Sequence, residues 1–178
     1  MEKKISKLLL AFTFSAALTG CLHDTTTVDT TENIEGVSMP SVQTADLYAY
    51  TLDYDNMINV PIDGSKVEYS GDILTAMNNL ATILSDQAFD GLEIDIVNIE
   101  NVDDKKIVTI NLQDGDKGSW YNYFQGSAGG LVTVRSLEET FLQRAYPGEW
   151  IDGVQFQYNG EPMPEFDHTV GLESVIYR

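Results

Sequence analysis

The sequence predicts an α+β domain in which two helices pack on one face of a mostly antiparallel sheet. Two stretches place apolar residues at helical spacing, and several shorter stretches alternate apolar and polar residues with a period of two. Each expected helix has a single apolar stripe, so both helices should cover one side of the sheet and leave the other side to solvent. The expected order of elements is β-α-β-β-α-β.

A hairpin is expected first. Residues 47–52 are rich in aromatic and β-branched side chains, residues 53–56 have the composition of a turn, and residues 57–62 form a second short strand. Pro61 cannot donate a ladder hydrogen bond, which favours an edge position for that second strand.

The first helix follows candidate N-caps at Ser70 and Asp72. Its stripe recurs at steps of four, three and four residues and consists of Ile73, Met77, Leu80 and Leu84. This spacing predicts one helix that buries one face.

Two half-buried strands come next, because residues 92–96 and 108–112 alternate apolar with polar side chains. The connection at residues 101–106 is too short for a crossover, so the two strands should be antiparallel neighbours.

The segment 114–130 combines five glycines with a cluster of aromatic residues, namely Trp120, Tyr121, Tyr123 and Phe124. So many aromatic side chains predict a segment that folds back onto the core, and a surface patch for protein or glycan contact is the alternative.

A second helix is expected over about residues 131–146, where Pro147-Gly148 would stop it. Residues 154–158 then alternate as a strand before Asn159-Gly160, a strong tight-turn signal.

The N-terminus has the three regions of a secretory signal. Three lysines precede an uncharged run of eleven residues, which is shorter than the roughly 20 residues of a membrane span. The run ends at Leu18-Thr19-Gly20-Cys21, which resembles the bacterial lipobox, whose cysteine accepts a diacylglyceryl group before cleavage. We therefore expect a signal peptide at residues 1–20 and lipid attachment at Cys21; the alternative is a buried cysteine after an uncleaved helix.

Cleavage before Cys21 would remove three lysines and one glutamate, leaving 158 residues with 7 basic and 27 acidic side chains and a net charge of −20. This charge repels phosphate backbones and argues against a nucleic-acid partner. Residues 21–45 are polar and acidic and are expected to form a flexible tether. The folded domain should then occupy residues 46–178. A single cysteine excludes an internal disulfide and a zinc cluster.

Candidate chemistry is sparse beyond the tether. His168 lies beside Asp167, and hydroxyls such as Ser174 are near in sequence, but no G-x-S-x-G motif is present. A structural role for His168, tying the tail to the domain through hydrogen bonds, is favoured over a catalytic base. We expect no catalytic residue, no metal site, no cofactor and no enzymatic activity.

Three further patterns are expected to be structural. Asp114-Gly-Asp116 begins like a calcium loop, but Gln125 stands at position twelve in place of the bidentate Glu. Glu138 and Glu139 are consecutive on a helix and should form a solvated face. Glycines 126, 129 and 130 lack a phosphate-binding motif and are expected to be a loop hinge.

Several short motifs, taken in order, resemble the GerMN domain of spore-germination and sporulation lipoproteins. They are Leu47-Tyr48, Val60-Pro61, the helix at 73–80, Ile107-Val-Thr-Ile-Asn-Leu112, Gly126-Ser127, Val154-Gln-Phe-Gln-Tyr-Asn-Gly160 and Asp167-His168-Thr-Val-Gly-Leu172. The resemblance covers about residues 46–178. It departs after the first helix, where Ser85-Asp-Gln-Ala-Phe-Asp-Gly91 replaces the Gly-Pro and Ile-Pro-x-Gly stretches of the family.

The resemblance implies a non-enzymatic envelope protein with an architecture like that of ring-building motifs. Together with the Cys21 anchor, it predicts an extracytoplasmic, membrane-anchored lipoprotein that binds or scaffolds unidentified envelope proteins, in sporulation or spore germination. The alternative is a small-ligand or glycan-binding envelope receptor, or an envelope hydrolase. The oligomeric state stays open, although like-charge repulsion disfavours a ring of this chain alone.

Overall fold

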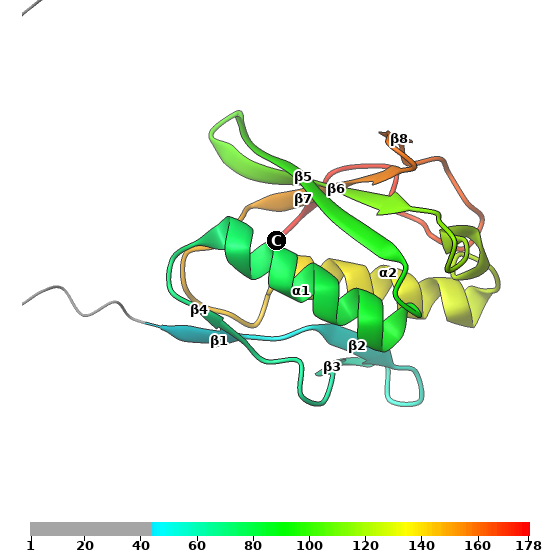
Figure 1. The fold of residues 1–178 in the computed structure, drawn as a ribbon, viewed down its shortest axis with the longest axis horizontal. Helices are drawn as coiled ribbons and strands as arrows, with labels where there is room; N and C mark the ends of the chain where they lie inside the picture. Colours follow the sequence, from blue (N-terminus) through cyan, green and yellow to red (C-terminus); the bar gives the residue numbers. More distant parts are fainter. Residues whose placement is uncertain (1–43) are drawn as a thin grey trace, which may run out of the picture. The chain divides into compact units, whose positions relative to one another are not determined.

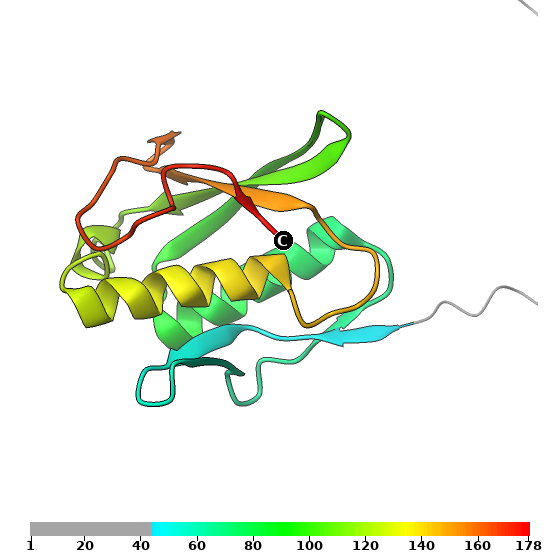
Figure 2. The same ribbon diagram turned by 180° about the vertical axis from the view of Figure 1, so that it is seen from behind.

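The computed structural model describes residues 44–178. Two helices lie side by side between a larger sheet on one side and two short hairpin-like sheets on the other (Figures 1 and 2). This arrangement confirms the predicted α+β class, with two helices and mostly antiparallel strand pairs. The predicted signal peptide at 1–20 and the lipid site at Cys21 lie outside the described residues. So does nearly all of the predicted tether at 21–45.

The elements follow one another along the chain as β1 (Ala45–Leu47), β2 (Tyr50–Asp53), β3 (Ile58–Pro61), β4 (Val67–Tyr69), α1 (Ile73–Ala88), β5 (Glu93–Val102), β6 (Lys105–Gln113), the 3-10 helix η1 (Trp120–Asn122), α2 (Ser127–Leu142), β7 (Gly153–Tyr158), β8 (Glu161–Pro162) and β9 (Ile176–Tyr177).

The larger sheet has the strand order β5-β6-β7-β8, and β9 also pairs with β7. Strands β5 and β6 are antiparallel neighbours, as their short connection predicts, and the register shifts between Ile96 and Asn98. Strands β6 and β7 are parallel because α2 makes the crossover between them. The far end of the β5–β6 ribbon projects beyond the helices (Figure 1).

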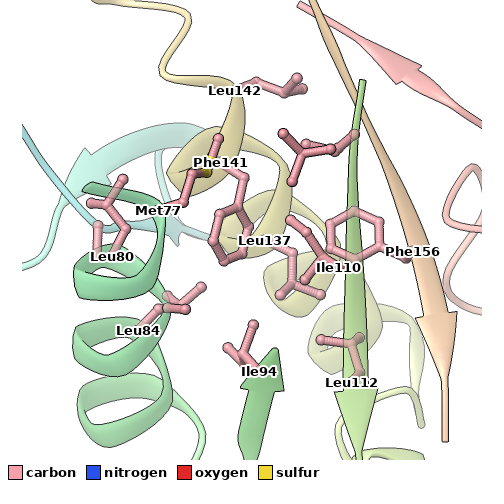
Figure 3. Packing of buried hydrophobic residues seen from close by; sticks show 14 of the residues in the cluster. Met77, Leu80, Leu84, Ile94, Ile110, Leu112, Leu137, Phe141, Leu142 and Phe156 are labelled. Atoms are coloured by element: carbon pink, nitrogen blue, oxygen red, sulfur yellow. The ribbon is translucent and has the colours of Figure 1, made fainter. Parts of the chain in front are cut away.

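The core fills the space between the helices and the larger sheet (Figure 3). Met77, Leu80 and Leu84 of α1 are fully buried, which confirms the predicted stripe. They face side chains of α2 and the sheet, among them Leu137, Phe141, Ile110, Leu112 and Phe156. Asp72 caps α1, because its carboxylate accepts a hydrogen bond from the Thr75 amide at 3.1 Å.

The opposite face of the larger sheet is polar, as expected. Gln155 is exposed there, and Thr109 and Gln157 are half-buried. Asn111 on this face is buried and accepts the Gly160 amide at 2.7 Å, which fixes the Asn159-Gly160 turn between β7 and β8.

The predicted first hairpin exists as β2 and β3, with Pro61 at the end of an edge strand, but it does not join the larger sheet. Its neighbour β1 pairs instead with β4, a strand that the sequence analysis did not predict. Side chains at the C-terminal end of α2 and of the residue directly after it hold this layer. The Gln143 amide group bonds both the N–H and the C=O of Tyr48, and Thr140 Oγ1 accepts the Tyr50 amide at 2.8 Å.

The predicted bounds of the second helix were wrong at both ends. Helix α2 begins at Ser127, so Gly129 and Gly130 lie in its first turn and are not a loop hinge. It ends before Gln143, whose backbone is left-handed (φ 46°), and not at Pro147-Gly148. The hydrogen bonds of Gln143 to Tyr48 and to the Thr140 carbonyl explain why the chain turns there.

Candidate functional site

His168 lies at the surface of the domain, near the start of α2. Its side chain is half-buried beside a shallow cavity of about 360 Å³ that Asp167, Ser127 and Val170 also line. Among residues 44–178, no hydrogen bond involves the imidazole, so neither a Ser–His nor a His–Asp pair is formed. The expectation that this side chain ties the tail down by hydrogen bonds is therefore wrong. The C-terminal segment is held against the domain by packing, because the His168 backbone lies directly against Gly130 of α2.

Asp114 organises the loop between β6 and α2, in place of the weakly indicated calcium site. Its carboxylate accepts hydrogen bonds from the Tyr158 hydroxyl at 2.6 Å, the Trp120 amide at 2.7 Å and the Ser119 hydroxyl at 2.9 Å. Burial by itself would raise the pKa of Asp114, but these hydrogen bonds outweigh burial and hold the pKa below its usual value. The Asp114 carboxylate is thus a structural acceptor. Within the part of the chain that the structure describes, no three His, Cys, Asp or Glu side chains gather as metal ligands.

The expectation of a solvated Glu138-Glu139 face was wrong. Glu138 is buried and pairs with Arg135 at 3.1 Å and with Arg144 at 3.5 Å, while Glu139 pairs with Arg144. Arg144 also donates to the backbone oxygen of Tyr177 in β9. Arg144 therefore links the two glutamates of α2 to β9, and this role of the glutamates is structural.

The aromatic segment is a cover for the core, which decides between the two alternatives that the sequence left open. Trp120 and Phe124 are fully buried, and the Trp120 indole donates to the Glu93 carbonyl at 3.1 Å. Trp150, the second tryptophan, is also buried and donates to the Phe141 carbonyl at 2.7 Å. Neither tryptophan offers an exposed plane for a glycan.

An apolar groove lies where α1 ends and α2 begins, beside the turn of the β2–β3 hairpin. It has a volume of about 640 Å³. Its apolar and small lining residues are Tyr54, Ile62, Ala88, Phe89, Tyr123, Ala128, Gly129 and Val132, and its polar ones are Thr51, Gln87, Asn122, Thr133 and Ser136. Four separate segments of the chain therefore build one cavity.

Most polar groups of the groove are already hydrogen-bonded within the protein. The Thr133 hydroxyl donates to the Tyr123 carbonyl at 2.9 Å, and the Ser136 hydroxyl donates to the Val132 carbonyl at 2.7 Å. The Tyr123 hydroxyl donates to Asp90 at 2.6 Å, and burial together with this carboxylate raises the pKa of Tyr123 to about 12. Tyr123 is thus neutral and fixed in place. The surface of the groove is therefore mainly apolar.

The hairpin turn next to the groove exposes three large apolar side chains. Tyr54, Met57 and Ile58 have exposed fractions of 49%, 59% and 52%. The turn itself is rigidified by Asp53, whose carboxylate accepts the amides of Asp55 and Asn56 at 3.1 and 3.2 Å. Apolar residues held outward on an ordered turn, beside an apolar cavity, indicate a contact site.

Two other cavities are polar. One of about 510 Å³ lies between α1 and β5 and has Asp86, Glu93 and Asp95 in its lining. Another of about 750 Å³ is lined by Lys106, Glu149 and other charged groups, and Lys106 pairs with Glu149 at 3.4 Å. Size alone does not select a binding site, and the apolar groove has the composition that binding pockets favour.

This groove could not be predicted from the sequence. Its one local signal was Tyr54 and Met57, bulky apolar residues within a turn that is otherwise Asp and Asn. No helix within residues 44–178 has the length and apolar character that a membrane crossing requires. No protein-family model matches the chain, and no curated protein and no solved structure matches it either.

Proposed function

We propose that this chain is a lipid-anchored, extracytoplasmic envelope protein that acts by protein–protein contact, with the apolar groove as its contact site. The groove carries the proposal, because an apolar cavity next to three exposed apolar side chains gains free energy when a partner covers it. The lipobox-like Leu18-Thr19-Gly20-Cys21 supports the anchor. Two acyl chains on Cys21 would hold the protein at a bilayer without help from basic residues.

The resemblance to GerMN lipoproteins supports a role in sporulation or spore germination. It rests on the ordered motifs of the sequence, such as Asp167-His168-Thr-Val-Gly-Leu172. Deleting the gene in an endospore-forming host and counting heat-resistant and germinated spores tests that role; unchanged counts would contradict it.

A small-ligand receptor is the second candidate. The groove volume of about 640 Å³ falls within the range of roughly 300–1,000 Å³ that is usual for ligand pockets. A partner protein and a small ligand predict different crosslinking results, so one experiment separates them.

The test places a photocrosslinking amino acid at Tyr54 in the cell, with a matched position at Gln155 on the exposed polar face of the sheet. A protein adduct is expected from position 54 and not from position 155, and adding Val132→Asn in the groove should remove it. If neither position gives a protein adduct while the purified protein carries a small molecule, the receptor would replace the contact protein.

The anchor has its own test. Cys21→Ala should release the protein from the membrane fraction, because the acylated thiol is gone. A variant that stays fully membrane-bound would refute lipid anchoring at Cys21.

A further inference from the structure

Four aspartates are direct sequence neighbours of residues that line the apolar groove. Asp53 and Asp55 flank the lining residue Tyr54, Asp63 follows Ile62, and Asp90 follows Phe89. The carboxylate of Asp90 also accepts the hydroxyl of the lining residue Tyr123. Asp55, Asp63 and Asp90 are exposed, so their carboxylates remain in solvent next to residues that line the groove.

Cations are few around the groove in the part of the chain that the structure describes. Within residues 44–178, no lysine or arginine is part of its lining. Arg135 is next to the lining residue Ser136, but its guanidinium pairs with Glu138. Lys117 lies over Gly91 and lines an adjoining cavity of about 200 Å³ together with Asp90, so one cation stands near one of the carboxylates. The groove is therefore an apolar slot with more aspartates than cations around it.

We infer that the occupant of the groove is a segment of a partner protein in which two or three adjacent apolar side chains are flanked by lysine or arginine. This inference rests on the proposed function and names the partner chemistry of the same site. Small residues in the lining, Ala88, Ala128 and Gly129, leave room for large apolar side chains. The flanking cations meet the carboxylates, which favours association and excludes acidic partners.

The same aspartates disfavour two other occupants. A second copy of this chain would bring the same carboxylates and a net charge of the same sign. An anionic lipid surface would be repelled for the same reason. Both become outcomes of the test.

The test uses the full-length protein purified in a mild detergent, with fluorescein-labelled peptides as probes and anisotropy as the readout. One peptide is Lys-Lys-Leu-Phe-Leu-Lys-Lys, the second replaces every lysine with glutamate, and the third replaces its apolar core with Ser-Asn-Ser. The first peptide is expected to bind at least tenfold more tightly than either of the others, and its affinity should fall as salt rises.

Two variants that each remove three negative charges distinguish an effect of the aspartates beside the groove from an effect of the net charge of the protein. Asp55→Asn/Asp63→Asn/Asp90→Asn removes three charges beside the groove. Glu100→Gln/Asp103→Asn/Asp104→Asn removes three exposed charges from the end of the projecting β5–β6 ribbon. The first variant should weaken binding of the lysine peptide about tenfold, and the ribbon variant by about twofold or less. Equal losses in the two variants would overturn the inference.

The groove itself is tested with Val132→Asn against Val170→Asn, since Val132 lines the groove and Val170 does not. If neither the lysine peptide nor the glutamate peptide binds, or if Val132→Asn does not change peptide binding, the groove is not a contact site and the proposed function is wrong. If the lysine and glutamate peptides bind equally and Val132→Asn weakens both, the groove stands and the inferred charge pattern is wrong. A dimer in sedimentation that Val132→Asn dissociates would put a second copy in the groove and overturn the inference.

Discussion

Two loops of this domain carry bulky apolar side chains, and only one of them covers the core. The segment before α2 buries Trp120 and Phe124 completely, whereas the β2–β3 turn leaves Tyr54 and Met57 about half exposed. Both loops contain an Asp that bonds backbone amides, Asp114 in one and Asp53 in the other. The partners of the two carboxylates differ. Asp114 also accepts a hydrogen bond from Tyr158 in β7, whereas the partners of the Asp53 carboxylate among residues 44–178 all lie in its own turn.

This difference shows how loops of similar composition can cover the core in one case and leave apolar side chains exposed in the other. A carboxylate that joins a loop to a distant strand holds the aromatic rings inward, where Trp120 packs on Phe89 at a centroid distance of 4.7 Å. A carboxylate that closes a local turn shapes the turn without bringing it to the core. The four predictions below test this contrast.

The largest effect is expected for Trp120→Ala. Removing a fully buried indole should lower the free energy of unfolding by about 3–5 kcal/mol. Urea denaturation followed by circular dichroism measures it, and Tyr121→Ala, at a neighbouring residue that is 50% exposed, is the control with a loss of less than about 1 kcal/mol. Equal losses for the two variants would contradict burial of the segment.

Asp114→Asn should come next. It removes charge-assisted hydrogen bonds and should lower the free energy of unfolding at pH 7 by about 1.5–3 kcal/mol.

The effect of Asp114→Asn should also depend on pH. The folded-state pKa of Asp114 is depressed, so its stabilising contribution is present above the usual Asp pKa of about 3.9 and is lost as the pH falls through the lower folded value. The gap between wild type and variant should therefore shrink from pH 7 to pH 2.5 in matched urea titrations. A gap that stays constant with pH would show that the ionised form is not the one that stabilises.

Gly130→Ala tests whether the C-terminal segment helps to hold the aromatic loop. Phe166 of that segment packs on Phe124 at 4.9 Å, and a Cβ at position 130 would overlap the His168 backbone. The variant should lose about 1–3 kcal/mol. Gly129→Ala, in the same turn with no atom within 4 Å of the added Cβ, should gain about 0.5–1 kcal/mol, since alanine favours the helix. Thermal melting of both variants checks the opposite signs.

The smallest effect on stability is expected at the other loop. Tyr54→Ala should change the free energy of unfolding by no more than about 0.5 kcal/mol, because the ring is half exposed and lies on a locally closed turn. The same variant should weaken binding of the lysine peptide to the groove, because Tyr54 is one of its lining residues. Strong destabilisation by Tyr54→Ala would erase the contrast between the two loops.

Local patterns were enough to predict most of the larger sheet and α1. The spacing of Met77, Leu80 and Leu84 and the alternation around Ile110 are properties of single segments, and the structure buries those side chains as predicted. The short connection after Val102 also determined the antiparallel pairing of β5 and β6.

What the sequence did not predict depends on contacts between distant segments. Gly129 and Gly130 read as a loop because glycine disfavours helices, yet the close approach of His168 requires a residue without a Cβ in that turn. Strand β4 has three residues and exists through its pairing with β1. The groove is assembled from four segments, so no single stretch of sequence displays it.

The bonds from Gln143 and Thr140 to the backbone of Tyr48 and Tyr50 have a consequence for local opening of the molecule. Here the side chains of Thr140 in α2 and of Gln143 directly after it accept the amide protons that a neighbouring strand would otherwise accept. Exchange of the Tyr48 and Tyr50 amide protons with deuterium should therefore follow the opening of the last turn of α2 and not that of the larger sheet. The first strands and the second helix would then open together as one cooperative unit.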